Sequence, residues 1–401
     1  MKIAIYTDDA PIKEELLAAG LSRINTRFFA SIKENITTIV ATHQGRYFSK
    51  DDLDADLRSK IVFMNINQFF AKVMKKLTKK AEDLFGIDLD LLYRMFLPKI
   101  LRTINESNSD YLFVPLGANI RGYRRAIDVS EKTKLPLAVF IGDEFKNYAV
   151  LSENKNSIEM CDKYLYKWLH KTSKIFVISN GMKNFLAKQY DVESIVLNLP
   201  YKKKYDIEDD EKSNAVFFLG NASHFYHDGL VDMMNVICDY NAKHDGDIYM
   251  RFTINVLPDI FEKRHMKYIK YGKIDTDYNS SREISEALFC FIPTSFDEKY
   301  SVMVSTSFPS KLMECLAFAK NIVVYGPEYS SSVDYFKQNN LKTCLSVRDK
   351  DKLFGILDDM VTSRGDYSKE YSQVIKDNHS LNYLKSTIMN NLKQLSIKKV
   401  N

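Results

Sequence analysis

Residues 305–329, STSFPSKLMECLAFAKNIVVYGPEY, join a polar loop, a helical pattern and a short buried-strand pattern in immediate succession. Pro309 suits the first turn of a helix, because its ring fixes φ and its missing N–H would have no partner there. We therefore expect the helix to begin near Phe308 or Pro309. Apolar residues then recur at helical spacing. Residues 322–325, IVVY, form a β-branched run closed by Gly-Pro, which predicts a buried strand.

The polar side of this expected helix carries Ser310, Lys311 and Glu314. A helix N-terminus presents free N–H groups and a positive dipole end, so a Ser-Lys pair there suits a diphosphate. Glu314, one turn on, would accept hydrogen bonds from two vicinal ribose hydroxyls. The structural alternative is that Ser307 or Ser310 caps the helix and that Lys311 and Glu314 form a surface ion pair worth about 0.2 to 0.5 kcal/mol.

Strand and helix patterns alternate through the rest of the chain. Residues 2–9 and 37–42 predict strands joined by a loop and a helix, which is a βαβ unit with a parallel sheet. A similar series begins with a strand at 215–218. Between the two series, residues 201–213 are rich in charge and poor in apolar side chains, as in an interdomain linker. With 401 residues, two domains are expected. The predicted fold class is α/β, with two Rossmann-like, doubly wound domains.

Candidate site residues of the first half follow predicted strands or open predicted helices. Open parallel sheets bind ligands beyond the carboxyl ends of their strands, where Asp143 and Glu144 follow the strand LAVFI. We predict Asp143, and after it Glu144, as the carboxylate that lines this crevice. The alternative is that they cap the next turn. Gly20, before the expected N-cap Ser22, marks a loop that approaches phosphates, or a turn without a ligand.

Two polar loops of the second half carry the other candidates. The candidate ligand-binding residues in and beside these loops are Gly220, Asn221, His224, Thr294 and Pro309. His224 and His227 have no third ligand at a spacing that zinc would use. We therefore predict a metal-independent protein without a cofactor.

Composition is that of a soluble globular protein, with 45% hydrophobic and 27% charged residues and a net charge of +5. No signal-peptide pattern and no apolar run of about 18 residues occurs. Five scattered cysteines without C-x-x-C spacing indicate free thiols in a reducing compartment. These features predict a cytoplasmic protein.

Residues 67–84 have the pattern of a basic amphipathic helix. Such a helix can lie on the anionic inner leaflet of a membrane, which would make the protein peripheral. The alternative is a helix that packs on its own core with a solvated lysine face. No other basic stretch is interleaved with aromatic residues, so nucleic acid is not an expected partner.

The string SFPSKLMECLAFAKNIVVYGP, preceded by FIPTSFDEKY, resembles the C-terminal-domain signature of bacterial GT-B glycosyltransferases, particularly family 4-like enzymes of surface polysaccharide assembly. The resemblance implies that Ser310 and Lys311 contact a donor diphosphate, with Lys311 as the principal cation on the phosphates and the main catalytic charge, and that Glu314 binds the nucleotide ribose. It also implies that Asp143, and after it Glu144, faces the sugar or the acceptor hydroxyl. The other residues that it places at the donor are Gly20, Gly220, Asn221, His224, Thr294 and Pro309. It also implies a last helix that crosses back to the first domain. The expected divisions are an acceptor domain at 1–200, a linker at 201–213, a donor domain at 214–378 and the returning helix at 379–401.

The function that the resemblance implies is transfer of a sugar from a nucleotide-diphosphate donor to a hydroxyl of a glycan or lipid-linked acceptor, as in capsule or O-antigen synthesis. Family 4 enzymes often carry a second glutamate eight positions before the first, where this chain has Thr306. Two alternatives therefore stay open: a catalytically idle GT-B-like protein that binds a nucleotide or glycan, and a nucleotide-sugar epimerase. The donor, the acceptor, the linkage and the stereochemical course are left open.

Overall fold

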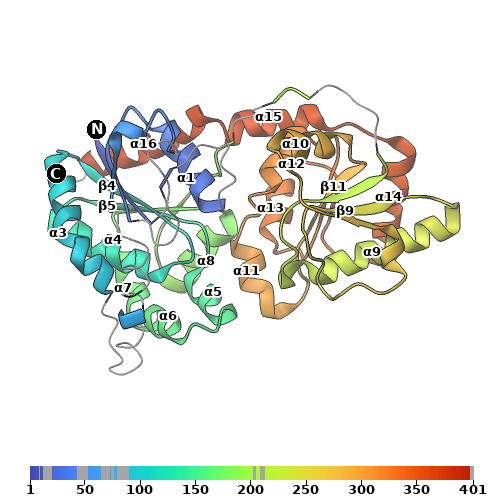
Figure 1. Ribbon diagram of the computed structural model, residues 1–401, viewed down its shortest axis with the longest axis horizontal. Helices are drawn as coiled ribbons and strands as arrows, with labels where there is room; N and C mark the ends of the chain where they lie inside the picture. Colours follow the sequence, from blue (N-terminus) through green and yellow to red (C-terminus); the bar gives the residue numbers. More distant parts are fainter. Residues whose placement is uncertain are drawn as a thin grey trace. The chain divides into compact units, whose positions relative to one another are not determined.

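The structure is a computed structural model, and its residues form two compact units (Figure 1). The residues that it describes are 1–8, 10–11, 20–42, 53–64, 73, 76–78, 90–201, 205–207 and 213–397. Unit 1 comprises Met1–Ile178, Lys183–Pro200 and Leu381–Asn401, and unit 2 comprises Ser179–Met182 and Tyr201–Ser380.

Unit 1 is built on a seven-stranded parallel sheet in the order β3-β2-β1-β4-β5-β6-β7. Its strands are β1 (Ile3–Thr7), β2 (Ile36–Ala41), β3 (Ile61–Phe63), β4 (Tyr111–Leu116), β5 (Leu137–Ile141), β6 (Lys174–Val177) and β7 (Ile195–Val196). Every residue of β1, β4 and β5 is buried. Continuous burial is typical of a parallel strand covered on both faces, and it explains why these strands are nearly continuous apolar runs.

Helices alternate with these strands along the chain. They are α1 (Gly20–Ser31), α3 (Leu91–Glu106), α4 (Ile120–Thr133), α5 (Phe145–Leu151), α6 (Lys155–Met160), α7 (Tyr166–Lys171), α8 (Asn180–Tyr190) and α16 (Leu381–Ile397). The last helix, α16, packs on α1 within unit 1, and the Lys385 ammonium group lies 2.6 Å from the Glu34 carboxylate (Figure 1). The C-terminal helix thus returns to the first domain, as the resemblance implied.

Unit 2 is built on a six-stranded parallel sheet in the order β10-β9-β8-β11-β12-β13. Its strands are β8 (Ala215–Phe218), β9 (Tyr249–Phe252), β10 (Ile269–Tyr271), β11 (Phe289–Pro293), β12 (Ile322–Tyr325) and β13 (Cys344–Leu345). Its helices are α9 (His227–His244), α10 (Asp277–Glu286), α11 (Ser301–Thr306), α12 (Leu312–Phe318), α13 (Ser331–Gln338), α14 (Lys350–Ser363) and α15 (Ser368–Asn378).

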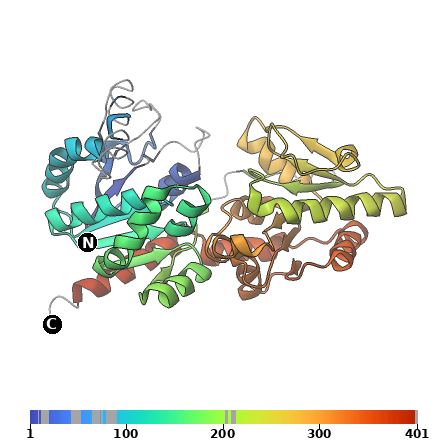
Figure 2. The same ribbon diagram turned by 90° about the horizontal axis from the view of Figure 1, so that it is seen from below.

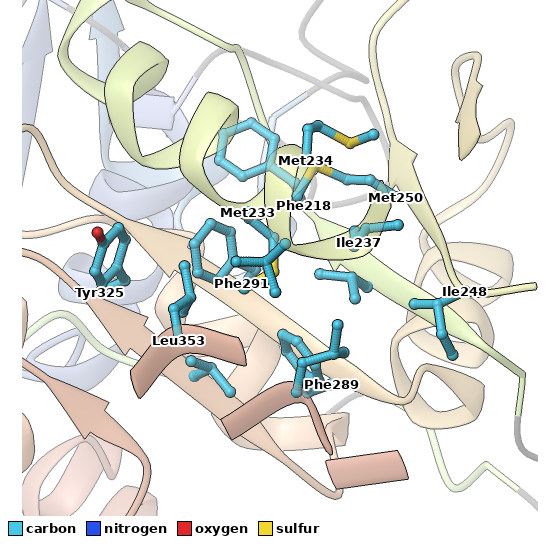
Figure 3. Close-up of a cluster of buried hydrophobic side chains, with 14 of the residues drawn as sticks. Phe218, Met233, Met234, Ile237, Ile248, Met250, Phe289, Phe291, Tyr325 and Leu353 are labelled. Atoms are coloured by element: carbon cyan, nitrogen blue, oxygen red, sulfur yellow. The ribbon is translucent and has the colours of Figure 1, made fainter. Parts of the chain in front are cut away.

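The core of unit 2 follows the two-residue period of its strands. Phe289 and Phe291 of β11 face α9 and α14, and they pack with Met233 of α9 and Leu353 of α14 (Figure 3). Figure 2 shows α9 running along the sheet. Helices α10, α12 and α15 pack on one another in a second layer. The predicted α/β class with two doubly wound sheets is confirmed by these two sheets.

Two predicted helix starts are wrong by a few residues. The expected start near Pro309 moves to Leu312, because residues 309–311 form a turn in which the Leu312 N–H donates to Pro309 and the Met313 N–H to Ser310. These bonds span three residues instead of the four of an α-helix. In unit 1, α1 begins at Gly20, two residues before the expected cap Ser22.

The predicted basic helix at 67–84 lies outside the described residues except for 73 and 76–78, and most of the predicted linker at 201–213 does too. Across the part of the chain that the structure describes, no helix has both the length and the apolar character needed to cross a membrane.

Candidate functional site

The predicted donor-binding residues of unit 2 lie around the point where the strand order of its sheet reverses. After β8 the chain adds β9 and β10 on one side, and then returns to place β11 on the other. The carboxyl ends of β8 and β11 therefore flank a topological switch point, the usual ligand crevice of an open α/β sheet. Gly220 follows β8 by two residues, and Thr294 follows β11 directly.

Gly220 and Lys311 are brought together at this switch point. Gly220 has a φ of +110°, which only glycine adopts without strain. A Cβ atom at Gly220 would stand 3.4 Å from Cγ of Lys311, so the lysine stem lies directly over the turn. The Gly220 N–H donates to the Thr253 hydroxyl at 3.1 Å, which fixes the turn. The positive φ is therefore what requires glycine here, since a Cβ would make only ordinary van der Waals contact with the lysine stem.

Lys311 enters the site from the turn that precedes α12. It is the N-cap residue of the helix, and its own side chain makes no capping hydrogen bond. Lys311 and Glu314 do not form the ion pair of the structural alternative, and no carboxylate in the described parts of the chain lies within ion-pair distance of the Lys311 ammonium group. The structure therefore leaves this lysine available to an anion.

Glu314 stands in the first turn of α12. Its Oε2 atom is buried, and it accepts no hydrogen bond from any described residue. A buried acceptor without a donor costs about 1 to 3 kcal/mol, so such atoms are rare in native proteins and call for an explanation. A ligand that donates hydrogen bonds to this carboxylate would remove the cost.

Thr294, the third predicted residue at the switch point, is buried, and its hydroxyl donates to Ser330 at 3.0 Å. Thr306, which stands where family 4 enzymes often have their second glutamate, is also buried. Its hydroxyl donates to the Val302 carbonyl one helical turn back, at 2.7 Å. Both hydroxyls therefore donate their hydrogen bonds to other groups of the protein.

Asn221 and His224 are exposed in the turn after β8. The Asn221 carbonyl accepts from the Ser223 N–H, and the His224 ring contacts that of His227 with centroids 4.9 Å apart. Among the described residues, no three histidine, cysteine, aspartate or glutamate side chains are grouped so that they could hold a metal ion.

In unit 1, Asp143 and Glu144 follow β5 as expected, but the two carboxylates differ. Glu144 is buried and caps α5, with its two oxygens accepting from Lys146 N–H at 3.1 Å and Asn147 N–H at 2.5 Å. Burial raises the pKa of Glu144 above its ordinary value, although these two hydrogen bonds oppose the shift. The capping alternative therefore describes Glu144, whereas Asp143 is partly exposed. Gly20 is the first residue of α1.

A pocket of about 350 Å³ opens at the switch point of the unit 1 sheet, where β1 and β4 lie side by side. The described residues that line it are Asp8, Pro115, Leu116, Gly117, Ala118, Asn119, Ile120, Gly122, Tyr148, Ala149, Ser152, Asn154 and Ser157. Sequence analysis missed this pocket and placed its candidate carboxylates after β5. The available signal was Asp8, which directly follows the first strand.

No protein-family model matches the chain, and neither does any curated protein. Solved structures match over nearly its whole length. Trehalose-6-phosphate synthase from Burkholderia multivorans is 9% identical with a TM-score of 0.60, and the match covers 100% of this chain and 98% of that one. HepE from Anabaena, in complex with UDP, is 8% identical with a TM-score of 0.57, over 98% and 100%. The chain has the GT-B fold.

A third GT-B neighbour is an alpha-glucosyltransferase in complex with UDP-glucose and DNA. It is 12% identical with a TM-score of 0.54, and the match covers 99% of both chains. These structural matches show the GT-B fold. Because the identities are this low, the family 4 likeness and the surface-polysaccharide role stay predictions.

Proposed function

We propose that the chain is a glycosyltransferase that moves a sugar from a nucleoside diphosphate donor to a hydroxyl group. The observation that carries this proposal is the buried Oε2 of Glu314, which accepts from no described residue, in the same short segment as Lys311, which pairs with no described carboxylate, at the switch point of a GT-B sheet. The two ends of a nucleoside diphosphate need these two groups: an acceptor for ribose hydroxyls and a cation for phosphate. Solved neighbours that hold UDP or UDP-glucose support the nucleotide-sugar class.

Glu314 would bind the ribose. A carboxylate has two oxygens that accept hydrogen bonds, and two vicinal ribose hydroxyls can donate to it. Its Oε2, which accepts from none of the residues that the structure describes, can take such a hydrogen bond. Because this contact would be the same in the ground state and the transition state, Glu314 would set donor affinity more than the rate of transfer.

Lys311 would act on the leaving group. When the bond between the sugar and the diphosphate breaks, the diphosphate departs with the electron pair and gains negative charge. A fixed cation and N–H groups beside that charge stabilise the transition state. Lys311 and the turn of residues 309–311 are the candidates, and the lysine stem lies against Gly220.

The acceptor in this proposal is a hydroxyl of a glycan or lipid-linked glycan of a bacterial surface, as the resemblance implied. Contact with the inner membrane leaflet would run through the basic stretch at 67–84. No metal or other cofactor is part of the proposal.

The test is calorimetric binding of UDP, GDP, dTDP, ADP and CMP to the wild type, followed by assays of diphosphate release from the matching nucleotide sugar. Selective binding of one diphosphate that Glu314→Ala loses would support the site. The matched control is Glu370→Ala, which removes an exposed glutamate of α15 in the same unit. If no nucleotide binds, the proposal fails.

A catalytically idle binding protein is the second candidate, and Thr306 is the observation that favours it. Its hydroxyl is buried and bonded to Val302, so it does not replace the carboxylate that family 4 enzymes often have there. An idle protein would bind the diphosphate without releasing it from a nucleotide sugar, whether or not an acceptor is present.

A further inference from the structure

The segment just before Lys311 is held by α13 at two successive residues. The Ser331 hydroxyl, at the start of α13, donates to the carbonyl of Ser307. One residue on, the Phe308 ring makes an edge contact with the Tyr335 ring, with centroids 5.0 Å apart. Ser331 and Tyr335 are one helical turn apart, so they lie on the same face of α13. This face therefore fixes the chain directly before the turn that carries Lys311.

Tyr335 is itself held by a buried histidine. Its hydroxyl lies 2.6 Å from Nε2 of His379, the residue that follows α15, and the two ring centroids are 5.8 Å apart. His379 is 0% exposed and Tyr335 8%. The backbone of His379 is fixed as well, since its N–H donates to Ile375 at 2.9 Å and its carbonyl accepts from the Tyr201 N–H at 3.0 Å. A path of contacts thus runs from the end of α15 through Tyr335 to Phe308.

The polar character of this pair calls for a reason beyond packing. A phenylalanine at position 335 would fill nearly the same space without a hydroxyl group to desolvate. A hydrogen bond restrains direction as well as distance, and a fully satisfied buried pair makes its surroundings rigid. The hydrogen bond to His379 therefore fixes the angle at which the Tyr335 ring meets Phe308.

Lys311 depends on such support from the backbone. No described carboxylate lies within ion-pair distance of its ammonium group, so no ion pair with a described residue fixes the side chain. Its backbone lies between α12 and the segment that α13 holds. A cation stabilises charge on a leaving group most when it is held in place before the reaction, because it then costs no rearrangement.

We infer that Tyr335 and His379 are positioning residues of the proposed reaction, which fix Phe308 and, through it, the turn that places Lys311 at the leaving diphosphate. The inference rests on the proposed function, because it takes Lys311 as the group that acts on the diphosphate. Neither Tyr335 nor His379 contacts the substrate in this scheme, and both act only through Lys311.

The first test is steady-state release of the diphosphate by Tyr335→Phe, which keeps the ring and removes the hydrogen bond. We expect kcat to fall about tenfold, because a catalytic group displaced by about 1 Å can lose about a hundredfold in rate. The donor KM should stay within about threefold, since Glu314 lies on α12, which packs on α10 and α15. His379→Gln should keep more activity than His379→Ala, because an amide can still form a hydrogen bond with the Tyr335 hydroxyl.

A double-mutant cycle tests whether the pair acts through Lys311. In a Lys311→Ala background, Tyr335→Phe should change kcat by less than about twofold, since the group that it positions is gone. The matched control is Tyr371→Phe, which removes another buried hydroxyl of unit 2, one that accepts from the Ile322 N–H at 3.1 Å. This control should lower stability and leave kcat within about twofold. A full Tyr335→Phe effect in the Lys311→Ala background, or an equal loss of kcat in Tyr371→Phe, overturns the inference.

Hydrogen exchange separates this inference from the proposed function, because it needs no nucleotide. The amides of residues 307, 312 and 313 are hydrogen-bonded in or beside the turn. They should exchange about tenfold faster in Tyr335→Phe than in the wild type, and at the wild-type rate in Tyr371→Phe. Unchanged exchange in Tyr335→Phe overturns the inference, whatever the wild type catalyses. A wild type that releases no diphosphate refutes the proposed function, and faster exchange in Tyr335→Phe then still supports the path from Tyr335 to the turn.

Discussion

Replacing Glu314 with methionine should weaken nucleotide binding and stabilise the unliganded protein at once. Methionine has a similar volume and no acceptor, so Glu314→Met removes the buried Oε2 that no described residue satisfies. An unsatisfied buried acceptor costs about 1 to 3 kcal/mol, and part of this cost should return as stability. For a protein unit of about 150 to 250 residues, each kcal/mol raises Tm by roughly 2 to 4 °C.

Binding should change in the opposite direction. A hydrogen bond to a charged group contributes about 1.5 to 3 kcal/mol, so the loss of one ribose contact should raise the Kd for the preferred diphosphate roughly 10- to 150-fold. Calorimetric titration and differential scanning calorimetry measure the two effects on the same protein sample. Glu370→Met is the control, since an exposed glutamate should shift neither by more than about 0.5 kcal/mol. A Kd within threefold of wild type, or a lower Tm for Glu314→Met, would refute the assignment.

Other predictions concern Lys311, Gly220 and Glu144. Lys311→Ala should lower kcat about a hundred- to a thousandfold, the effect of about 2.7 to 4 kcal/mol at a leaving diphosphate, and a loss below threefold in steady-state assays would contradict this role. Gly220→Ala should destabilise the protein by about 1 to 3 kcal/mol, because its φ of +110° strains any other residue, and an unchanged urea midpoint would count against it. Burial raises the folded-state pKa of Glu144 above its ordinary value of 4.5. The contribution of Glu144 to stability is therefore full below its unfolded-state pKa and is lost as the pH rises through its folded-state pKa. The difference in free energy of unfolding between wild type and Glu144→Gln should therefore fall as the pH rises above the ordinary pKa of 4.5, and a rising difference would argue against the assignment.

Local patterns were enough to predict the strands and the fold class. Residues 322–325 and 137–141 are apolar runs because both faces of a parallel strand are buried. Such a run can be recognised in the sequence without knowing which strands lie beside it. The start of α12 was less predictable. Pro309 fits a helix start and a tight turn equally well. The hydrogen bonds between residues three apart, which make this segment a turn, depend on the surrounding fold.

The pocket of unit 1 could not be predicted from local patterns. Asp8 and Asn119 are 111 residues apart. Arg125 donates to both Asp8 and Asp90, which belong to separate segments of the chain. No spacing rule links such residues, because the order of strands in the sheet brings them together. In unit 2, by contrast, Lys311 and Glu314 belong to one helix start, so a local pattern indicated them, and Gly220 is the partner that only the fold supplies.

The two sheets reverse their strand order in the same way, yet different side chains lie at the reversal. In unit 1 the residue after the first strand is Asp8, which is the one charged residue among the described ones that line the pocket. In unit 2 the turn after the first strand has Gly220, and the stem of Lys311 lies against it. The Arg125 guanidinium group lies 3.0 Å from Asp8 and offsets the charge of that carboxylate, whereas no described carboxylate lies within ion-pair distance of Lys311. Because a lysine without a carboxylate partner attracts phosphate, electrostatics favours unit 2 as the site of the proposed nucleoside diphosphate.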